Sequence, residues 1–443
     1  MKPTRIHMAD RTILGRGRDG IAMLAIASAL SCAQAEPGRP PEGKPGPSAS
    51  ALATPPPAKP DQAEPGGPAR ITLQSTVLGE ERKILVRTPE GYERGSARFP
   101  VLYLTDGDRH IGHTVSTVEF LAANGRMPEV IVVGISNTDR TRDLTPTKAS
   151  MKNEAGKEMK LPTAGGADKF LEFIEKELVP HVEKSYRTQP YRVFAGHSFG
   201  GLFAVHALVS KPELFQAVIS VAPSLHWDDA VVVKRAEQLL SSRPELDRTV
   251  FVTLGDEPGE PMAAFKRLQE IAAKKSPKGF QMEAVHMPDE DHGSIVMRSH
   301  YFGLRKVFDG WRMPKDPSTP GVAKSLDAVD AHYKTLSKRF GFDIAPPEPL
   351  VNQLGYDFLF DDKTDEAIAV FKSNVERYPG SANVYDSLAE AYEKKGQLDL
   401  AATNYGKAVK VAEETGQPNL EIFKTNFARV SGKAKPAPTC QPL

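Results

Sequence analysis

The clearest chemical signal in this 443-residue chain is the pentapeptide at 196–200, G-H-S-F-G, which matches the pattern G-x-S-x-G. In this pattern the serine lies on a sharp turn between a strand and a helix, where its hydroxyl is free to attack a carbonyl carbon. Residues 193–195 are apolar and of strand type, and residues 202–208 continue with the apolar spacing of a helix. The segment therefore predicts a nucleophile elbow with Ser198 as the nucleophile.

A nucleophilic serine needs a base. Its hydroxyl is a poor nucleophile until a neighbouring imidazole accepts the proton, and the imidazole needs an acceptor that fixes its tautomer. In folds with this elbow the acid follows a late strand and the histidine follows the next strand. His292 lies in a polar loop after the last predicted strand and is the predicted base. His286 lies on that strand, where we expect a half-buried structural role. His197 is adjacent to the nucleophile, where we expect a packing or pocket-lining role.

The acid has more than one candidate. Asp256 and Glu257 both follow the strand predicted at 249–254, and Asp289 and Asp291 precede the histidine in its own loop. The first two are favoured by their position after a strand. A Ser-His dyad without a strong acid is a further alternative.

The oxyanion formed during acyl transfer needs backbone N–H donors. We expect one from Phe199, directly after the nucleophile, and one from the loop around Gly107 and Asp108. Residues 105–109 are equally compatible with an ordinary turn, and they contain no HGGG-type lipase motif.

The elements that must position these residues alternate between strand and helix. Strands are predicted at 71–78, 82–88, 99–105, 130–135, 217–222, 249–254 and 281–286, and helices at 115–124, 168–183 and 262–275. The first two strands alternate apolar and polar residues, as in an antiparallel pair, and most later ones are near-continuous apolar runs. The order predicts an α/β-hydrolase domain over residues 71–312, with a mostly parallel sheet and helices on both faces.

Further motifs in this domain carry a family resemblance. They are P-V-L-Y-L-T-D-G-D (100–108), V-V-G-I-S-N-T-D-R-T-R-D-L-T-P-T (132–147), F-A-G-H-S-F-G-G-L (194–202), A-P-S-L-H-W (222–227) and E-D-H-G-S (290–294). Together they resemble the Putative esterase family, which includes enterochelin-esterase-type and IroE-like siderophore esterases. The resemblance implies a serine esterase that cleaves small-molecule carboxylic esters through an acyl-enzyme, with no metal and no cofactor.

The same resemblance implies that Arg140, Arg142 and Trp227 border the substrate pocket. An arginine there could hold an anionic or catecholate group, and an indole could stack on it. A surface ion pair for the arginines and core packing for the tryptophan are the alternatives. The charged segment 148–160 is expected to form a flap near the site.

Length and charge limit the remaining function classes. A chain of 443 residues is long enough for two domains plus tails. The formal net charge of +1 gives no electrostatic case for nucleic-acid binding. No apolar run reaches the roughly 18 residues that a membrane-spanning helix needs.

The N-terminus has the pattern of an export signal. A basic region precedes the short apolar run at 21–30, so residues 1–35 are predicted as a signal peptide. Cleavage after Ala35 would give a free periplasmic or secreted protein. Cleavage before Cys32 would give a lipoprotein anchored to the outer membrane through Cys32; residues 29–32 resemble a lipobox but have alanine instead of the usual leucine three residues before the cysteine. Residues 36–70 are rich in proline, glycine and alanine and predict a disordered linker.

The C-terminal region contains a repeat. After a linker at 313–321, apolar and small residues recur with a period of 34 over two segments, which is the tetratricopeptide signature. We therefore expect a tetratricopeptide-like helical domain at 322–430 and a disordered tail at 431–443. Two repeats are fewer than the three usually needed for a stable array, so this region should brace the enzyme or bind a protein partner.

Two other functions fit parts of the chain. An acyltransferase of the same fold would pass the acyl group to an alcohol instead of water. A non-catalytic envelope scaffold would use the repeats alone. A scaffold has no need for both Ser198 and His292, and their joint presence favours an enzyme.

Overall fold

The computed structural model describes residues 67–152, 158–314, 323 and 325–432. The expected signal peptide with Cys32, most of the linkers at 36–70 and 313–321, and nearly all of the tail at 431–443 lie outside the described residues. Within the described part, no helix is both long and apolar enough to cross a membrane.

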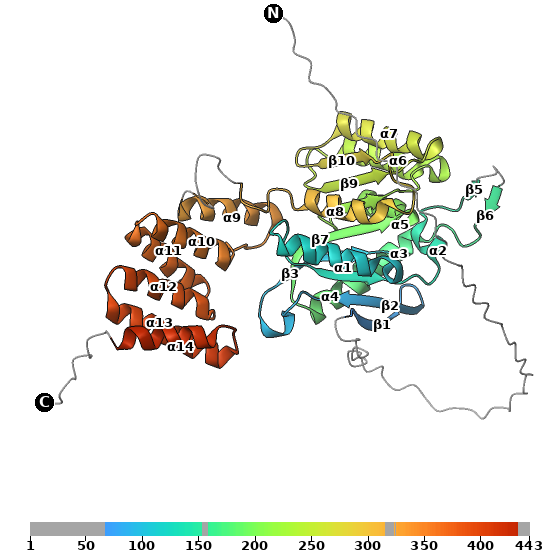
Figure 1. Cartoon of the computed structure of the whole chain (residues 1–443). Coiled ribbons are helices and arrows are strands. Elements are labelled where there is room, and N and C mark those ends of the chain that lie inside the picture. Colours follow the sequence, from blue (N-terminus) through green and yellow to red (C-terminus); the bar gives the residue numbers. More distant parts are fainter. Residues whose placement is uncertain (1–66, 153–157, 315–322, 324, 433–443) are drawn as a thin grey trace, which may run out of the picture. The chain divides into compact units, whose positions relative to one another are not determined.

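The described part of the hydrolase region is built on one eight-stranded sheet (Figure 1). In spatial order the strands are β1 (Ala69–Ser75), β2 (Glu80–Arg87), β4 (Ile131–Ile135), β3 (Phe99–Leu104), β7 (Thr188–His197), β8 (Ala217–Val221), β9 (Thr249–Leu254) and β10 (Gln281–His286). The pairs β1–β2 and β2–β4 are antiparallel, and every later neighbouring pair is parallel. The predicted mostly parallel sheet is confirmed.

Helices cover both faces of this sheet. Side chains alternate along a strand, so Phe194 of β7 contributes to the core on one face, and Val193 and Ala195 contribute to the core on the other. The Phe194 face is covered by α3 (Ala167–Phe173), α4 (Val179–Ser185), α5 (Phe199–Ser210), α6 (Trp227–Ser242) and α7 (Glu260–Lys275). The opposite face is covered by α1 (Gly107–Ala123) and α8 (Ile295–Val307).

Two predicted helices differ from the observed ones. Helix α1 begins at Gly107 and not at residue 115, because Asp106, with φ of 55°, turns the chain directly from β3 into the helix. The helix predicted at 168–183 contains a π turn at Ile174–Leu178 between α3 and α4. Glu177 in this turn accepts hydrogen bonds from the Ser75 hydroxyl and the Val77 N–H, so the turn ties the β1–β2 connection to the helix.

Two short strands, β5 (Ser150–Lys152) and β6 (Glu158–Lys160), form an antiparallel pair within the segment expected as a flap. A further short helix, α2 (Arg140–Leu144), precedes them and follows β4. These two features lie between β4 and α3 in the chain, at the end of the sheet that carries the elbow (Figure 1).

The C-terminal region is helical. It contains α9 (Leu326–Phe340), α10 (Glu348–Phe360), α11 (Thr364–Arg377), α12 (Ala382–Lys394), α13 (Leu398–Thr415) and α14 (Leu420–Ser431). Helix α12 begins and ends 34 residues after α10, and α13 begins 34 residues after α11, so the helix bounds match the predicted period. A Cβ at Gly355 would lie 2.4 Å from the Phe371 ring, which explains the small residue where two helices meet.

Aromatic side chains join α9 to the hydrolase core. The Phe340 ring lies 5.0 Å from the Tyr191 ring of β7 and 5.6 Å from the Phe308 ring that follows α8, measured between centroids. All three residues are buried in one apolar cluster. Helix α9 therefore packs into the same apolar core as α1 and α8.

Candidate active site

The elbow is formed by close backbone packing around Ser198. This residue has φ of 62° and ψ of −117°, a conformation that side chains rarely adopt, and it directly precedes α5. A Cβ at Gly196 would lie 2.2 Å from the Gly200 carbonyl oxygen, and a Cβ at Gly200 would lie 2.2 Å from the Thr105 hydroxyl. Both glycines of the motif are therefore sterically required, and the Ser198 side chain remains partly exposed.

The structure brings His292 together with one of the two favoured carboxylates. Nδ1 of His292 lies 2.8 Å from Oε2 of Glu257, whereas Asp256 is exposed and its N–H donates to the Glu290 carbonyl. The His292 side chain is 45% exposed and the Glu257 side chain only 17%. A hydrogen bond from Nδ1 to a carboxylate fixes the tautomer in which Nε2 is free to accept a proton. Of the adjacent pair of candidates, the geometry selects Glu257.

The carboxylates of the histidine loop have other partners. Asp289 pairs with Arg298, and Oδ1 of Asp291 accepts the N–H groups of Gly293 and Ser294 at 2.7 Å each. The latter contacts close a tight turn around His292. Neither residue is placed as the partner of the imidazole.

The expected oxyanion donors belong to residues at the N-termini of two helices. Phe199 is the first residue of α5, and Gly107 and Asp108 are the first residues of α1. First-turn N–H groups have no partner within their own helix and are available to an anion. A Cβ at Gly107 would lie 2.6 Å from the Gly134 backbone, so glycine allows α1 to begin this close to β4.

Arg140 lies beside the nucleophile and is held by Asp106. Its Nε lies 2.6 Å from Asp106 Oδ1, and its Nη2 donates to the carbonyl of His197 at 3.1 Å. The guanidinium is 5.5 Å from the centroid of the Phe199 ring, and the side chain is 34% exposed. Burial alone would raise the pKa of the Asp106 carboxyl, but hydrogen bonds from Arg140 and Asn137 leave this pKa below its usual value.

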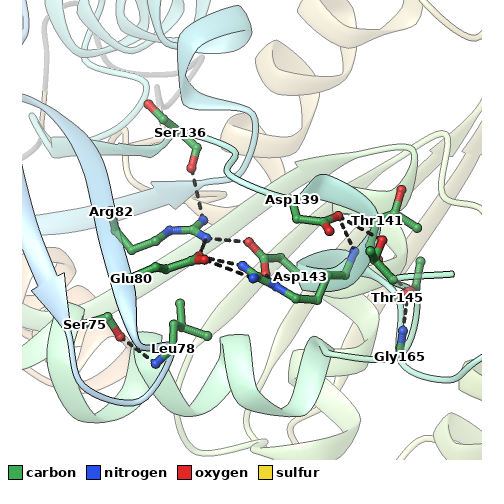
Figure 2. A network of polar contacts seen from close by, with 12 residues as sticks. Ser75, Leu78, Glu80, Arg82, Ser136, Asp139, Thr141, Asp143, Thr145 and Gly165 are labelled. Atoms are coloured by element: carbon green, nitrogen blue, oxygen red, sulfur yellow. Dashed lines mark hydrogen bonds and ion pairs between the residues drawn. The ribbon is translucent and has the colours of Figure 1, made fainter. Parts of the chain in front are cut away.

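Arg142 has a different environment. Its Nη2 pairs with Glu80 at 2.6 Å and its Nε with Asp143 at 2.8 Å. Figure 2 shows the polar network around Glu80 and Asp143. It includes Arg82, whose buried guanidinium contacts Asp143 at 2.6 Å. These contacts connect β2 to α2 and thereby fix the helix that begins with Arg140. The expected ligand role of Arg142 is replaced by the alternative of an ion pair, because all three of its guanidinium nitrogens donate to the carboxylates of Glu80 and Asp143.

Trp227 is also mainly structural. It is 2% exposed, its Nε1 donates to the Thr147 hydroxyl at 3.0 Å, and its ring packs edge-on against Phe199 at 5.4 Å. It forms part of the wall of a cavity of about 890 Å³, together with Lys148, His226 and residues of β5–β6 and α7. A buried indole with a satisfied N–H supports the residue after the nucleophile and offers little face for stacking.

Three residues near the site were not predicted from the sequence. Asp106 holds Arg140, the Asn137 amide donates to the same Asp106 carboxylate, and His197 contacts the loop that carries His292. A signal was present for Asp106, since an aspartate before a glycine tolerates the left-handed backbone that the turn into α1 requires. The contacts of Asn137 and His197 depend on tertiary structure and have no local signal.

A strained serine at the carboxyl end of a central parallel strand, with a histidine–glutamate pair beside it, defines a serine hydrolase of the α/β-hydrolase class. Comparison with known proteins agrees. Residues 75–293 match the family described as Putative esterase. The ferri-bacillibactin esterase BesA of Bacillus subtilis is 30% identical over 223 residues, which cover 45% of this chain and 75% of that protein. The chain belongs to this esterase family, and it is an ester-hydrolysing serine hydrolase.

Solved structures support the same class. An IroE-like serine hydrolase from Shewanella oneidensis superposes with a TM-score of 0.59 at 30% identity, over 70% of this chain and 99% of that chain. A chloroplastic tetratricopeptide repeat protein of Arabidopsis thaliana, PYG7, is 42% identical to this chain over 50 residues, which cover 11% of this chain and 17% of that protein.

Proposed function

We propose that this esterase cleaves siderophore-type esters through an acyl-enzyme on Ser198, with His292 as the base and Glu257 as the acid. The observation that carries the proposal is the 2.8 Å contact between His292 Nδ1 and Glu257 Oε2, made directly beside the elbow. This contact leaves Nε2 as the proton acceptor for the serine hydroxyl.

The reaction proceeds in two halves. Nε2 of His292 takes the Ser198 proton as Oγ bonds to the ester carbon, and the oxyanion is held by the N–H groups of Phe199 and of Gly107 or Asp108. The carbon–oxygen bond to the alcohol then breaks, and the alcohol leaves with the proton from His292. Water then attacks the acyl carbon while His292 takes its proton. The bond from this carbon to Oγ breaks, His292 returns the proton to Ser198, and the free acid leaves.

The siderophore assignment is supported by relatives and by Arg140. BesA is named as a ferri-bacillibactin esterase. Arg140 places a partly exposed cation next to both neighbours of Ser198, where it would pair with a catecholate or carboxylate oxygen of the substrate. Arginine is suited to this role because its planar donors match paired oxygens.

The test uses residues 71–443 of the chain and two substrates. We expect hydrolysis of short-chain p-nitrophenyl esters and of a tricatecholate trilactone, with both rates abolished by Ser198→Ala. Hydrolysis of the p-nitrophenyl ester alone would retain the esterase mechanism and contradict the siderophore assignment. Activity that survives Ser198→Ala would contradict the mechanism.

We further propose that the protein is exported and that Cys32 anchors it to the outer membrane as a lipoprotein. The support is the sequence pattern at 1–35. Fractionation of cells that express the full chain should place it in the membrane, and Cys32→Ala should release it into the periplasm. A wild-type chain found only in the soluble periplasmic fraction would contradict the anchor.

The helical region is proposed to be tetratricopeptide-like and to brace the hydrolase. Support comes from the 34-residue offset of its helices and from the apolar cluster that α9 shares with β7 and α8. Phe340→Ala should lower Tm by several degrees because it removes a buried ring. An unchanged Tm would favour the alternative, a binding surface for a protein partner.

A further inference from the structure

His197, the residue before the nucleophile, is hydrogen-bonded to the loop that carries the proposed base, His292. It is the last residue of β7, its side chain is 5% exposed, and its Nε2 lies 2.6 Å from the main-chain oxygen of His292. A carbonyl oxygen can only accept, so Nε2 carries the proton. The sequence predicts a packing or pocket-lining role for His197, and this hydrogen bond adds a direct link to the loop that carries His292.

The His197 ring has the protonation state and the tautomer that this hydrogen bond requires. Burial lowers the pKa of His197 to about 4, so the ring is neutral near pH 7 and has a single N–H. The hydrogen bond to His292 places that N–H on Nε2. The ring also packs against the His292 imidazole, with 4.8 Å between centroids.

Other imidazoles lie close to the His197 ring. His110 of α1 meets His197 edge-on at 5.5 Å, and His113 and His300 continue the cluster, with 5.2 Å between His110 and His113 and 5.4 Å between His113 and His300. Within the residues that the structure describes, no group of three or more side chains is arranged to hold a metal ion. The His197 ring is thus packed between His110 and His292, which restricts its rotation.

The loop that carries His292 needs such support. The His292 side chain is 45% exposed, and its pairing with Glu257 fixes the ring but not the backbone. The turn made by Asp291 orders the loop internally. The His197 bond fixes the loop relative to β7, whose next residue is Ser198.

We propose that His197 is a positioning residue, which donates Nε2–H to the His292 carbonyl and so keeps the His292 imidazole within reach of Ser198. The proposal rests on the proposed function, because it requires Ser198 and His292 to be the reacting pair. In this proposal, the residue before the nucleophile helps to fix the position of the base.

The test compares three variants of the full chain with a matched control. His197→Leu removes the donor at similar volume and should lower kcat by about 10- to 100-fold, with KM within about twofold, because a displacement of 1 Å is enough for losses of this size. His197→Gln places an amide N–H near the position of Nε2 and should restore kcat to within about fivefold of wild type. His206→Gln, at a buried histidine of α5 that pairs with Asp168 and lies outside this cluster, should leave kcat within about threefold.

His197→Asn covers the case in which His197→Leu does not fold. Its amide is too short to reach the His292 carbonyl, so kcat should fall in the Asn variant and not in the Gln variant. Equal kcat in these two variants, or wild-type kcat in His197→Leu, would overturn the positioning role while hydrolysis by the wild type preserves the proposed function. A wild-type chain that neither hydrolyses esters nor reacts with a fluorophosphonate would overturn both.

Discussion

The hydrolase region contains two histidine–carboxylate pairs, and we propose that only one of them serves catalysis. His292 Nδ1 lies 2.8 Å from Glu257, and His206 Nε2 of α5 lies 2.9 Å from Asp168. The second pair even has a serine, Ser210, whose hydroxyl is 3.4 Å from His206 Nδ1. In residue types and distances, the two arrangements are similar.

Exposure separates the two pairs. The His292 side chain is 45% exposed and its partner Glu257 is 17% exposed. The His206 side chain is fully buried, while its partner Asp168 is 78% exposed. A base must reach the substrate and its acid must be shielded, so only the first arrangement can work. Ser210 also ends an ordinary helix, whereas Ser198 has a strained backbone at the start of α5. Side-chain types alone do not define a catalytic site.

The largest expected difference is between the two histidines. His292→Ala should lower kcat/KM by about 10⁵-fold, because the serine loses its base. His206→Gln should leave kcat/KM within about threefold, since that imidazole serves packing. Steady-state kinetics with a p-nitrophenyl ester measures both, and a His292 variant within tenfold of wild type would contradict the assignment.

The carboxylates should differ by a smaller factor. Glu257→Gln should lower kcat/KM by about 10³-fold, because the neutral amide no longer stabilises the imidazolium or fixes its tautomer. Asp256→Asn and Asp168→Asn, which make no described contact with His292, should each stay within about threefold. A larger loss in Asp256→Asn than in Glu257→Gln would reverse the choice of acid.

The two arginines extend the comparison to the substrate pocket. Arg140→Gln should lower kcat/KM for a catecholate ester by about tenfold, through loss of a charge-assisted contact. Arg142→Gln should leave kcat/KM within about threefold and lower Tm, because its guanidinium pairs with Glu80 and Asp143. The opposite result, with Arg142 affecting KM and Arg140 only Tm, would exchange their roles.

The buried histidines should affect stability at low pH. Burial lowers the pKa of His110 to about 4 and of His300 to about 3, from ordinary values near 6.5, and lowers that of His206 as well. Below about pH 6.5 the unfolded chain binds protons that the folded chain does not, so stability falls as pH falls and is fully retained above that pH.

We therefore expect Tm to drop by about 5 to 10 °C between pH 7.5 and pH 5. Differential scanning calorimetry measures the drop, and His206→Gln should reduce it. A Tm that is constant over this range would show that these imidazoles are not buried as described.

The sequence was sufficient for features with local causes. The elbow could be predicted because Gly196 and Gly200 are required by contacts within a few residues of Ser198 and at the adjacent strand. The sheet could be predicted because its strands are apolar runs. The neighbouring candidates Asp256 and Glu257 could not be separated, because the direction of the chain after β9 depends on contact with the His292 loop. A Cβ at Gly255 would lie 2.6 Å from the Glu290 carbonyl there.

Tertiary contacts also explain the other differences. The start of α1 was predicted too late because residues 105–109 are polar and glycine-containing, which favours a turn unless packing against Gly134 holds them in a helix. The family resemblance placed Arg142 at the substrate pocket, with an ion pair as the alternative, and nothing in its local sequence reveals the pairing with Glu80 on a distant strand.

One measurement tests the central claim, that Ser198 and not another serine is the nucleophile activated by the His292–Glu257 pair. The wild-type chain is treated with a fluorophosphonate, digested, and analysed by mass spectrometry to locate the adduct. We predict a single adduct on Ser198 that is lost in His292→Ala. An adduct on Ser210, or ester hydrolysis with no adduct on Ser198, would contradict this account.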